Sequence, residues 1–299
     1  MGLLRLYRMM DKYSIRARKA DEIFSRYIKT NNPALISVYD EWASIKRNIN
    51  CPALTSLLGE RLCELEKRVF DLNKRNVSFF AGAAGRISDD LIDDRIVSAE
   101  EVYFLGDNKK ESKNSKQLLF YAFNDRTIEL LPKDFMEKFS DIIKLYNDAQ
   151  REGSCLSGDY DFQRIKEVKD KTGGYPILLL YNLMNPEERD LSVNFSPNYD
   201  SQNWTLPKTK GEAIFNLGVF MSRADDVYDK EFDMKQGIKS IATESDFGWK
   251  DVRRDIKYIE AGLERFYPKE SIKETIDDCK MMTGKMTLML DKIAQRLRF

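Results

Sequence analysis

The sequence predicts one large all-α domain. Apolar residues recur at helical spacing along nearly the whole chain, and no segment alternates apolar and polar side chains as a half-buried strand would. Only 15 Gly and 8 Pro occur in 299 residues, which suits long helices. No composition shift or internal repeat marks a boundary, so we expect a single domain over residues 1–299.

The individual helices are predicted from their apolar stripes. Over residues 53–75, Leu54, Leu58 and Leu62 share one face, with Glu and Lys opposite. Breaks are placed where Pro, Gly and Asn cluster. The same reasoning predicts helices over residues 4–29, 36–48, 77–96, 115–124, 134–152, 160–171, 208–232, 249–264 and 271–296.

Two polar stretches, 185–207 and 233–248, are predicted to be loops. Loops of this length in a compact domain usually have a functional role, so we expect both to act as lids or loops near an active site.

The composition excludes several kinds of chemistry. The chain has no histidine, which rules out Ser-His-Asp and Cys-His nucleophile systems, His-ligated metals and an imidazole base. The 49 Lys and Arg residues balance 49 Asp and Glu residues, and a neutral chain argues against a nucleic-acid partner. Any catalysis must therefore use carboxylates, Lys, Arg, Tyr, hydroxyl groups or a bound metal.

Cysteine usage and hydropathy favour a cytoplasmic protein. The four cysteines, at positions 51, 63, 155 and 279, form no close-spaced framework and suit reduced, packed thiols. The longest apolar stretch, 175–183, is interrupted by Pro176 and Asn182 and is too short to span a bilayer. We expect no stable membrane anchor.

Two segments at the ends of apolar helices contain DDxxD. On a helix the first and last Asp of this pattern share a face, with Cβ atoms about 5–6 Å apart. Like charges at that spacing repel each other and, near a helix C-terminus, oppose the helix dipole, so a compensating cation is expected. Mg²⁺ prefers carboxylate oxygens and completes its shell with water and phosphate. The predicted metal ligands are Asp89, Asp90, Asp93, Asp225, Asp226 and Asp229.

A simpler interpretation stays open for either motif alone, because an acidic run on a helix is usually a solvated face. The presence of two motifs, each after an apolar helix rather than a polar one, favours the metal site. Asp94 and Asp233, just beyond the motifs, are predicted to be solvated helix-end carboxylates.

The paired motifs in an all-helical chain of this length resemble the trans-isoprenyl diphosphate synthases, the family that includes farnesyl and geranylgeranyl diphosphate synthases. Lys171-Thr172-Gly173 resembles the family's Lys-Thr at a helix break, and the Gly and Lys of Gly237-Ile238-Lys239 resemble its Gly-Lys after the second motif. Order and approximate spacing agree over residues 46–239. The resemblance implies an isoprenoid-synthase fold, which is an antiparallel helix bundle around a deep central cavity.

The chain departs from the family pattern at the isopentenyl diphosphate site. Lys46 and Arg47 are a partial counterpart of the family's Gly-Lys-x-x-Arg-Pro, and Arg95 is the single Arg where Arg-Arg-Gly is usual. Ser222 replaces the Gln of Phe-Gln-x-x-DD, and the family's homoallylic-site histidine is missing. The half of the site that ionises the allylic substrate is therefore the better represented.

The resemblance implies a Mg²⁺-dependent prenyltransferase that condenses an allylic isoprenyl diphosphate with isopentenyl diphosphate, releases pyrophosphate and works as a homodimer. About three Mg²⁺ ions would bind with the diphosphate. Lys171, Thr172 and Lys239 are the implied catalytic residues. The implied diphosphate-binding residues are Lys46, Arg47, Arg95, Lys171 and Lys239.

An apolar pocket for the growing chain is expected on the helix before the first motif. In the family that the chain resembles, bulky residues one turn before this motif shorten the product, so the small residues here imply products of about C20 or longer, with Phe79 or Phe80 as a floor. Ordinary helix packing explains small residues equally well. The candidates are Phe79, Phe80, Ala81, Ala84 and Gly85.

Two other functions remain open. A class I terpene cyclase ionises the same substrates and carries (N/D)DxxSxxxE, a frame that Asp225, Asp229 and Asp233 occupy here. The Asp at 229 favours the elongating enzyme, whereas the missing arginines favour the cyclase. The missing arginines also agree with a non-catalytic subunit of the same fold, although such a subunit would be expected to lose its Asp motifs.

Overall fold

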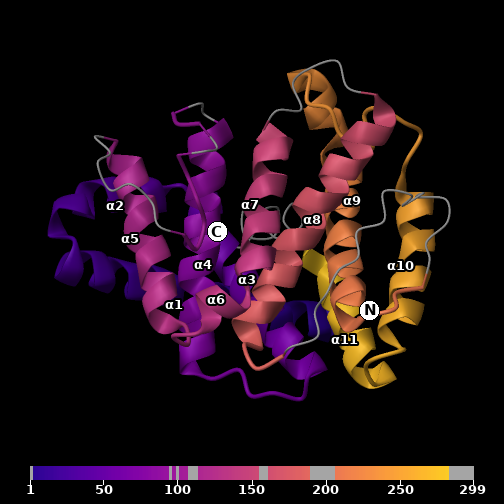
Figure 1. Cartoon of the computed structure of the whole chain (residues 1–299), viewed down its shortest axis with the longest axis horizontal. Helices are drawn as coiled ribbons and strands as arrows, with labels where there is room; N and C mark the ends of the chain where they lie inside the picture. The colour runs from indigo at the N-terminus through magenta and orange to yellow at the C-terminus, as the bar shows by residue number, and fades with distance from the viewer. Residues whose placement is uncertain are drawn as a thin grey trace. The chain divides into compact units, whose positions relative to one another are not determined.

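The structure, a computed structural model, describes residues 3–93, 96–98, 101–106, 114–154, 161–188 and 206–282, and all regular elements in these ranges are helical. The prediction of an all-α fold is confirmed. None of the described helices is long and apolar enough to cross a bilayer. The helices, labelled in Figure 1, are α1 Leu3–Asn31, a 3₁₀ turn Pro33–Leu35, α2 Ile36–Ser44, α3 Lys46–Leu65, α4 Leu72–Asp93, α5 Ser115–Leu130, α6 Phe135–Lys138, α7 Ser140–Ser154, α8 Phe162–Met184, α9 Lys210–Gln236, α10 Trp249–Leu263 and α11 Lys269–Met282.

The chain divides into two compact units. The first unit comprises Met1–Glu60 and Val69–Ile143, and the second comprises Arg61–Arg68 and Lys144–Phe299. The boundary falls inside α3, whose last residues belong to the second unit. A single domain over residues 1–299 stays a prediction.

An aromatic cluster forms the core of the first unit. The ring of Phe24 on α1 lies 4.9 Å from that of Phe123 on α5 and 5.2 Å from that of Phe80 on α4, measured between centroids. Trp42 on α2 joins Phe123 at 5.9 Å. These side chains are almost fully buried. Tilted and edge-on aromatic contacts of this kind add to the stabilisation that burial provides.

The second unit is organised around α8, α9 and α10, which lie side by side (Figure 1). Along α8 from Lys169 to Ile177, the contacted residues of α9 run backwards from Asp226 to Gly218, so these two helices are antiparallel. A Cβ on Gly218 would lie 2.4 Å from the carbonyl oxygen of Gly173 and 2.9 Å from the Cα of Gly174. The three glycines therefore allow the two helix backbones to approach more closely than larger side chains would permit.

Local signals define both ends of α9. Thr209 and Glu212 form a capping box, in which the Thr209 side chain accepts a hydrogen bond from the Glu212 backbone N–H and the Glu212 carboxylate accepts from the Thr209 N–H. At the other end Gly237 adopts the left-handed conformation with φ 68°, which favours glycine. The helix thus extends four residues into the 233–248 stretch predicted to be a loop.

The predicted helix break at Lys171-Thr172-Gly173 is wrong. The helix α8 runs without interruption from Phe162 to Met184 and includes Gly173, Gly174 and Pro176. Intrinsic preference disfavours all three in a helix interior, but here the glycine face packs on α9 and the apolar residues that follow are buried. Tertiary packing therefore outweighs the local signal.

Other boundaries differ in smaller ways. The helix predicted over 53–75 ends at Leu65, where Lys67 takes a left-handed φ of 54° and the Arg68 N–H donates to the Cys63 carbonyl over 2.8 Å. Ile45 is extended and separates α2 from α3, and the predicted 134–152 helix is two helices that meet at Phe139. Residues 189–205 of the first predicted lid, and 283–296 of the last predicted helix, lie outside the described residues.

We expect Gly218→Ala to lower the free energy of unfolding by about 1–3 kcal/mol, although Ala favours helix more than Gly does. The new methyl group would meet α8 backbone atoms, which cannot move aside as a flexible side chain can. Urea unfolding measures the change. Gly248→Ser is the matched control, since a Cβ there has its nearest atom at 3.9 Å. Equal stability of Gly218→Ala and wild type would contradict the close approach.

Candidate functional site

The first acidic motif lies at the C-terminal end of α4, in the first unit. Asp89 and Asp90 are half-buried there, and the side chain of Asp93 lies outside the described part of the structure. The Asp90 carboxylate pairs with Arg86, one turn earlier on α4, and lies 3.7 Å from the ammonium group of Lys116 on α5. Asp90 is therefore neutralised by cations of its own unit.

The second motif lies within α9, in the second unit. Asp225 is exposed and Asp229 is half-buried, whereas Asp226 is only 8% exposed. The Asp226 carboxylate accepts a hydrogen bond from the Ile241 backbone N–H over 3.1 Å and lies 3.9 Å from the Lys169 ammonium group. Burial raises the pKa of Asp226 to about 6, even though Lys169 and the Ile241 N–H act to lower it.

The two motifs share one arrangement. In each, the second Asp lies beside basic side chains of its own unit, Arg86 and Lys116 for Asp90 and Lys169 for Asp226. The first and last Asp of each motif lie one helical turn apart on a common face. The described residues contain no group of three or more Asp, Glu or Cys side chains placed to hold a metal ion. Because the first and last Asp provide only pairs, metal binding would need further oxygen ligands, such as phosphate and water.

Asp233 differs from its prediction as a solvated carboxylate, because it is 8% exposed. Burial and the nearby Asp229 raise the pKa of Asp233, while Lys169 and a hydrogen bond with Ser240 act to lower it. The burial of Asp233 could have been predicted from spacing, because Asp233 lies seven residues after Asp226 and so falls on the same helical stripe. Asp94, the other carboxylate predicted to be solvated, lies outside the described residues.

The lysine on the α9 side of α8 is Lys169 rather than Lys171. The Lys171 ammonium group lies 3.2 Å from the Glu152 carboxylate on α7 and 3.0 Å from that of Glu167 on α8. Because α8 is continuous, residues 169 and 171 point about 200° apart around its axis. The sequence prediction ended this helix at residue 171, so it gave no basis for comparing the directions of Lys169 and Lys171 on one continuous helix.

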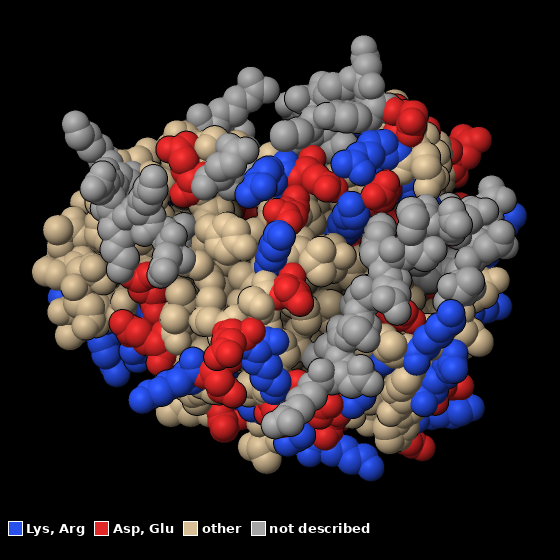
Figure 2. Space-filling model, in the orientation of Figure 1, with Lys and Arg blue, Asp and Glu red and all other residues tan. Residues whose placement is uncertain are grey.

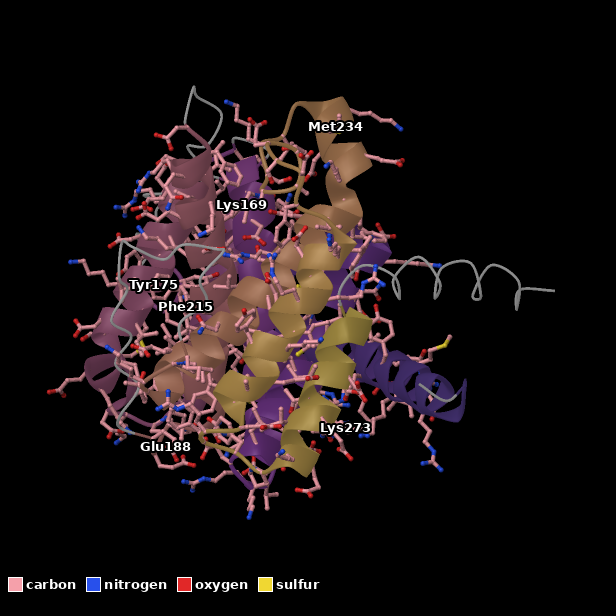
Figure 3. The ribbon with its side chains drawn as sticks, turned by 90° about the vertical axis from the view of Figure 1, so that its right-hand side faces the viewer. Lys169, Tyr175, Glu188, Phe215, Met234 and Lys273 are labelled. Carbon is pink, nitrogen blue, oxygen red and sulfur yellow. The ribbon has the colours of Figure 1, made fainter. Side chains whose placement is uncertain are left out.

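The other two predicted catalytic residues are Thr172 on α8 and Lys239 in the segment after α9. Thr172 donates from its hydroxyl to the Lys169 carbonyl over 3.1 Å, a local helix contact. Lys239 is half-buried in the segment that follows the Gly237 cap. In Figure 3, Lys169 lies toward the same end of the helix pair as Met234 of α9.

The predicted isopentenyl-site residues are less well defined. Lys46 is exposed at the first position of α3 in the first unit. The side chain of Arg47 and all of Arg95 lie outside the described residues. Their part in binding a second diphosphate stays a prediction.

The residues predicted to line a chain-length pocket are packed in the first unit. Phe80 contacts the rings of Phe24 and Tyr27, each at 5.2 Å, and Phe79 is fully buried. Ala81 and Ala84 are buried beside them and Gly85 is half-buried. The two Phe side chains thus belong to the aromatic core, and a role as a pocket floor stays a prediction.

A buried ion-pair network, which the sequence did not reveal, lies next to the second motif. Arg223 is 1% exposed, and its guanidinium group donates two hydrogen bonds to Asp170, over 2.9 and 2.7 Å, and one to Asp255 over 3.2 Å. Lys166 completes the network at 3.4 Å from Asp170. The network fixes the rotation of α9 two residues before Asp225. The available signal was one Arg among the apolar residues of the helix.

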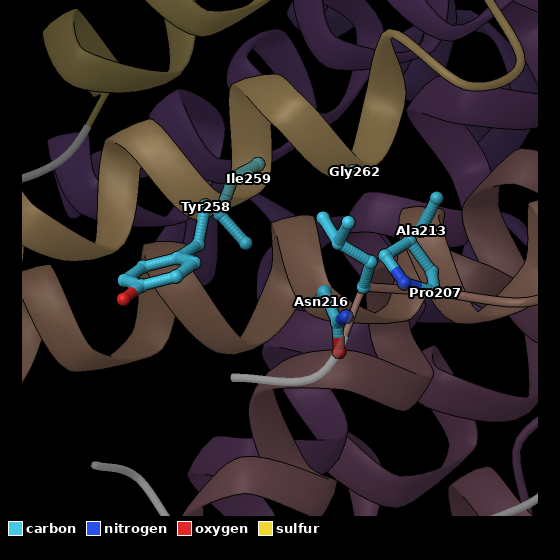
Figure 4. A pocket seen from close by; sticks show the side chains of 7 residues that line it. Pro207, Ala213, Asn216, Tyr258, Ile259 and Gly262 are labelled. Atoms are coloured by element: carbon cyan, nitrogen blue, oxygen red, sulfur yellow. The ribbon is translucent and has the colours of Figure 1, made fainter. Parts of the chain in front are cut away.

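A small hollow in the second unit lies between α9, α10 and the segment at Pro207 (Figure 4). It holds about 230 Å³ of empty space that includes open solvent. Asn216 and Tyr258 supply its polar side chains, and Asn216 lies about 13 Å along α9 from Asp225 at 1.5 Å per residue. The hollow therefore brings none of the predicted catalytic groups together.

Charges of both signs are mixed on the surface. On the face shown in Figure 2, Lys and Arg side chains lie among Asp and Glu rather than in one large patch. This agrees with the equal totals of 49 basic and 49 acidic residues.

The chain matches no protein family model, no curated protein and no solved structure. The functional assignment therefore depends on the acidic motifs, the cations that pair with them and the resemblance carried by the sequence.

Replacing Arg223 with Met should lower the free energy of unfolding by about 3–5 kcal/mol, because the buried carboxylates of Asp170 and Asp255 would lose the cation that they share. Chemical denaturation measures the change. Arg254→Ala is the matched control: its side chain is 46% exposed and lies 3.8 Å from Asp255, so we expect a loss below about 1 kcal/mol. Comparable losses in both variants would show that the buried network stabilises the fold no more than an exposed ion pair does.

Stability should depend on the charge of Asp226. Its folded-state pKa, about 6, is above the unfolded value near 3.8, so its contribution is fully present below pH 3.8 and is lost as the pH rises through 6. Asp226→Asn cannot titrate. In metal-free buffer, we expect wild type to lose on the order of 2–3 kcal/mol relative to Asp226→Asn between pH 4 and 7. A difference independent of pH would contradict the burial of an ionisable carboxyl group.

Proposed function

We propose that this chain is a Mg²⁺-dependent prenyltransferase of the farnesyl or geranylgeranyl type. It would join an allylic isoprenyl diphosphate to isopentenyl diphosphate and release pyrophosphate. The observation that carries the proposal is the pair of DDxxD motifs on α4 and α9, in which Asp90 pairs with Arg86 and Lys116 and Asp226 lies 3.9 Å from Lys169. The proposal requires an isoprenoid-synthase fold with a central cavity and both motifs acting on one diphosphate.

The residues present fit Mg²⁺ in their donor chemistry. Asp89, Asp93, Asp225 and Asp229 are carboxylates in pairs one turn apart, and oxygen ligands of this kind suit a hard divalent cation. When bound, Mg²⁺ would supply positive charge that stabilises the departing pyrophosphate. Asp90 and Asp226 would support the pairs through their ion pairs rather than lead the coordination.

The chain's own cations would do the rest of the neutralisation. Lys169, beside Asp226 and Asp233, is the α8 lysine best placed to meet a phosphate oxygen near the second motif. Lys239 would contribute from the segment after α9. Lys171 is engaged by Glu152 and Glu167, so its role would be to hold α7 against α8. No step needs histidine, because released pyrophosphate can accept the final proton.

One observation favours a second candidate, a class I terpene cyclase. Asp225, Asp229 and Asp233 follow one another at four-residue steps along α9, and Asp233 is buried near Asp229. This is the frame of the cyclase metal motif. A cyclase would use the same ionisation step but direct the cation to a double bond of its own chain.

Product analysis distinguishes these functions. Purified protein would be incubated with Mg²⁺ and geranyl, farnesyl or geranylgeranyl diphosphate, with and without isopentenyl diphosphate. Longer diphosphates that require isopentenyl diphosphate support elongation, and hydrocarbons or alcohols formed without it support cyclisation. We expect Asp89→Asn and Asp225→Asn to lower turnover by at least about 100-fold, with the exposed Asp40→Asn unchanged. If no product forms and both variants bind Mg²⁺ and pyrophosphate as wild type does, the enzyme assignment is wrong.

The two α8 lysines give a sharper prediction. Lys169→Gln should raise the dissociation constant for Mg²⁺-pyrophosphate by about 10-fold or more, because a charge next to the second motif is lost. Lys171→Gln should leave this constant within about 3-fold of wild type, since Lys171 pairs with two carboxylates. Calorimetric titration measures both, with thermal melting to confirm folding. The reverse order would restore Lys171 as the phosphate ligand.

A further inference from the structure

The face of α9 that meets α10 carries two polar side chains two helical turns apart. Asn216 and Arg223 are separated by seven residues, so they lie within about 20° of each other around the helix. Both are buried, at 8% and 1% exposed. The guanidinium group of Arg223 pairs with carboxylates, one of them that of Asp255 on α10. At Arg223, α10 thus supplies a group that satisfies the buried side chain.

Asn216 has no such partner. Its carboxamide forms no hydrogen bond with any group in the part of the chain that the structure describes. By contrast, the buried carboxamide of Asn124 accepts from the Leu105 N–H over 2.7 Å. A carboxamide offers two donor hydrogens and an acceptor oxygen, and leaving these unpaired in the interior destabilises a fold. The amide of Asn216 is therefore available to water or to a ligand.

This amide lines the hollow between α9, α10 and the segment at Pro207. In Figure 4 the Asn216 side chain lies between the ring of Tyr258 and that of Pro207. The wall at Pro207 is fixed in two ways. A Cβ on Gly262 would lie 3.0 Å from the Pro207 ring, so glycine there allows the ring to pack on α10. Arg265 also donates to the Pro207 carbonyl over 2.7 Å.

Exposed apolar side chains flank the amide. Leu206 is 50% exposed and Tyr258 is 39% exposed, and both line the hollow. The Tyr258 hydroxyl also forms no hydrogen bond with a described residue. An occupant would cover apolar carbon of both side chains and meet the polar groups of Asn216 and Tyr258. Apolar walls with a few convergent polar groups are typical of small-molecule sites.

Charge and size restrict the occupant. None of the seven residues that line the hollow is charged. Glu212, one turn before Asn216, is engaged by the N–H groups of Lys208 and Thr209. A charged ligand would lose its hydration here without gaining a counter-charge. The space of about 230 Å³, which includes open solvent, is below the roughly 300–1,000 Å³ of sites for drug-sized ligands. A neutral molecule of about one ring with a substituent fits both restrictions.

We propose that this hollow binds a small, neutral, flat molecule with a carbonyl and an N–H on the same edge, as in primary amides and lactam rings. Such an edge can exchange two hydrogen bonds with the Asn216 carboxamide, while the ring lies against Leu206 and Tyr258. A trans peptide group cannot do this, because its N–H and C=O point in opposite directions. This inference goes beyond the proposed function and does not rest on it, since it requires neither Mg²⁺ nor a prenyl substrate.

Ligand-detected NMR titration of the full chain in metal-free buffer tests the proposal, with benzamide as the probe. A ligand of this size binds weakly, so we expect saturable binding with a dissociation constant on the order of 1 mM. Benzoate has the same shape but a negative charge and no N–H, and it should bind at least about 10-fold more weakly. Asn216→Leu should weaken benzamide binding by at least about 10-fold. Asn31→Leu, which removes an exposed carboxamide, should bind as wild type does.

Thermal melting separates a ligand-binding role of Asn216 from a structural one. Because the carboxamide makes no hydrogen bond with described residues, Asn216→Leu should melt at or above the temperature of wild type. A second variant tests the site through exposed side chains alone: Leu206→Ser with Tyr258→Ser should also weaken benzamide binding by at least about 10-fold. The matched control carries Ser at two other exposed apolar positions, Val69 and Leu72, and should bind as wild type does.

Three results would overturn the proposal. Absence of saturable benzamide binding to wild type up to about 20 mM would leave only water in the hollow. Equal affinity for benzoate and benzamide would remove the role of the amide edge. Wild-type affinity in Asn216→Leu, or in the variant with Ser at both 206 and 258, would place benzamide elsewhere on the protein.

Discussion

The second unit depends on one interaction, the buried pairing of Arg223 with Asp170 and Asp255. A charge taken out of water is tolerated only when it is paired, so α8, α9 and α10 must keep Arg223 turned toward these two carboxylates. Because α9 is rigid, this fixes where the next residues point. Asp225 is directed to solvent and Asp226 toward Lys169. The buried network thus sets the direction in which the residues of the acidic motif point.

Close packing sets how near α8 lies to α9 and its acidic motif. Gly173, Gly174 and Gly218 bring α8 against α9, and the ring of Tyr175 packs on Phe215 at 5.0 Å. The same contact keeps α8 helical through two glycines and a proline. Continuity of α8 then decides which lysine lies beside the motif, because a break would have freed the chain to turn either Lys169 or Lys171 toward α9.

The two acidic motifs show how a neutral protein can present concentrated negative charge. In the first unit Asp90 pairs with Arg86 and Lys116, and in the second unit burial outweighs the nearby Lys169 and raises the pKa of Asp226. The first and last Asp keep a shared face. The proposal of prenyl transfer depends on both motifs, one on α4 and one on α9.

The sequence by itself determined the all-α class, most helix positions and the two DDxxD stripes, because periodicity and i, i+4 spacing are local properties of a helix. It did not reveal that Asp233 is buried, that Arg223 is central or that Lys169 replaces Lys171 beside the motif. Those depend on which face of a helix meets another helix, and local propensity at Gly173 and Pro176 pointed the wrong way. Only the tertiary structure, through burial and pairing of charges, decided them, since the free energy of an ionised side chain is set by neighbours distant in sequence.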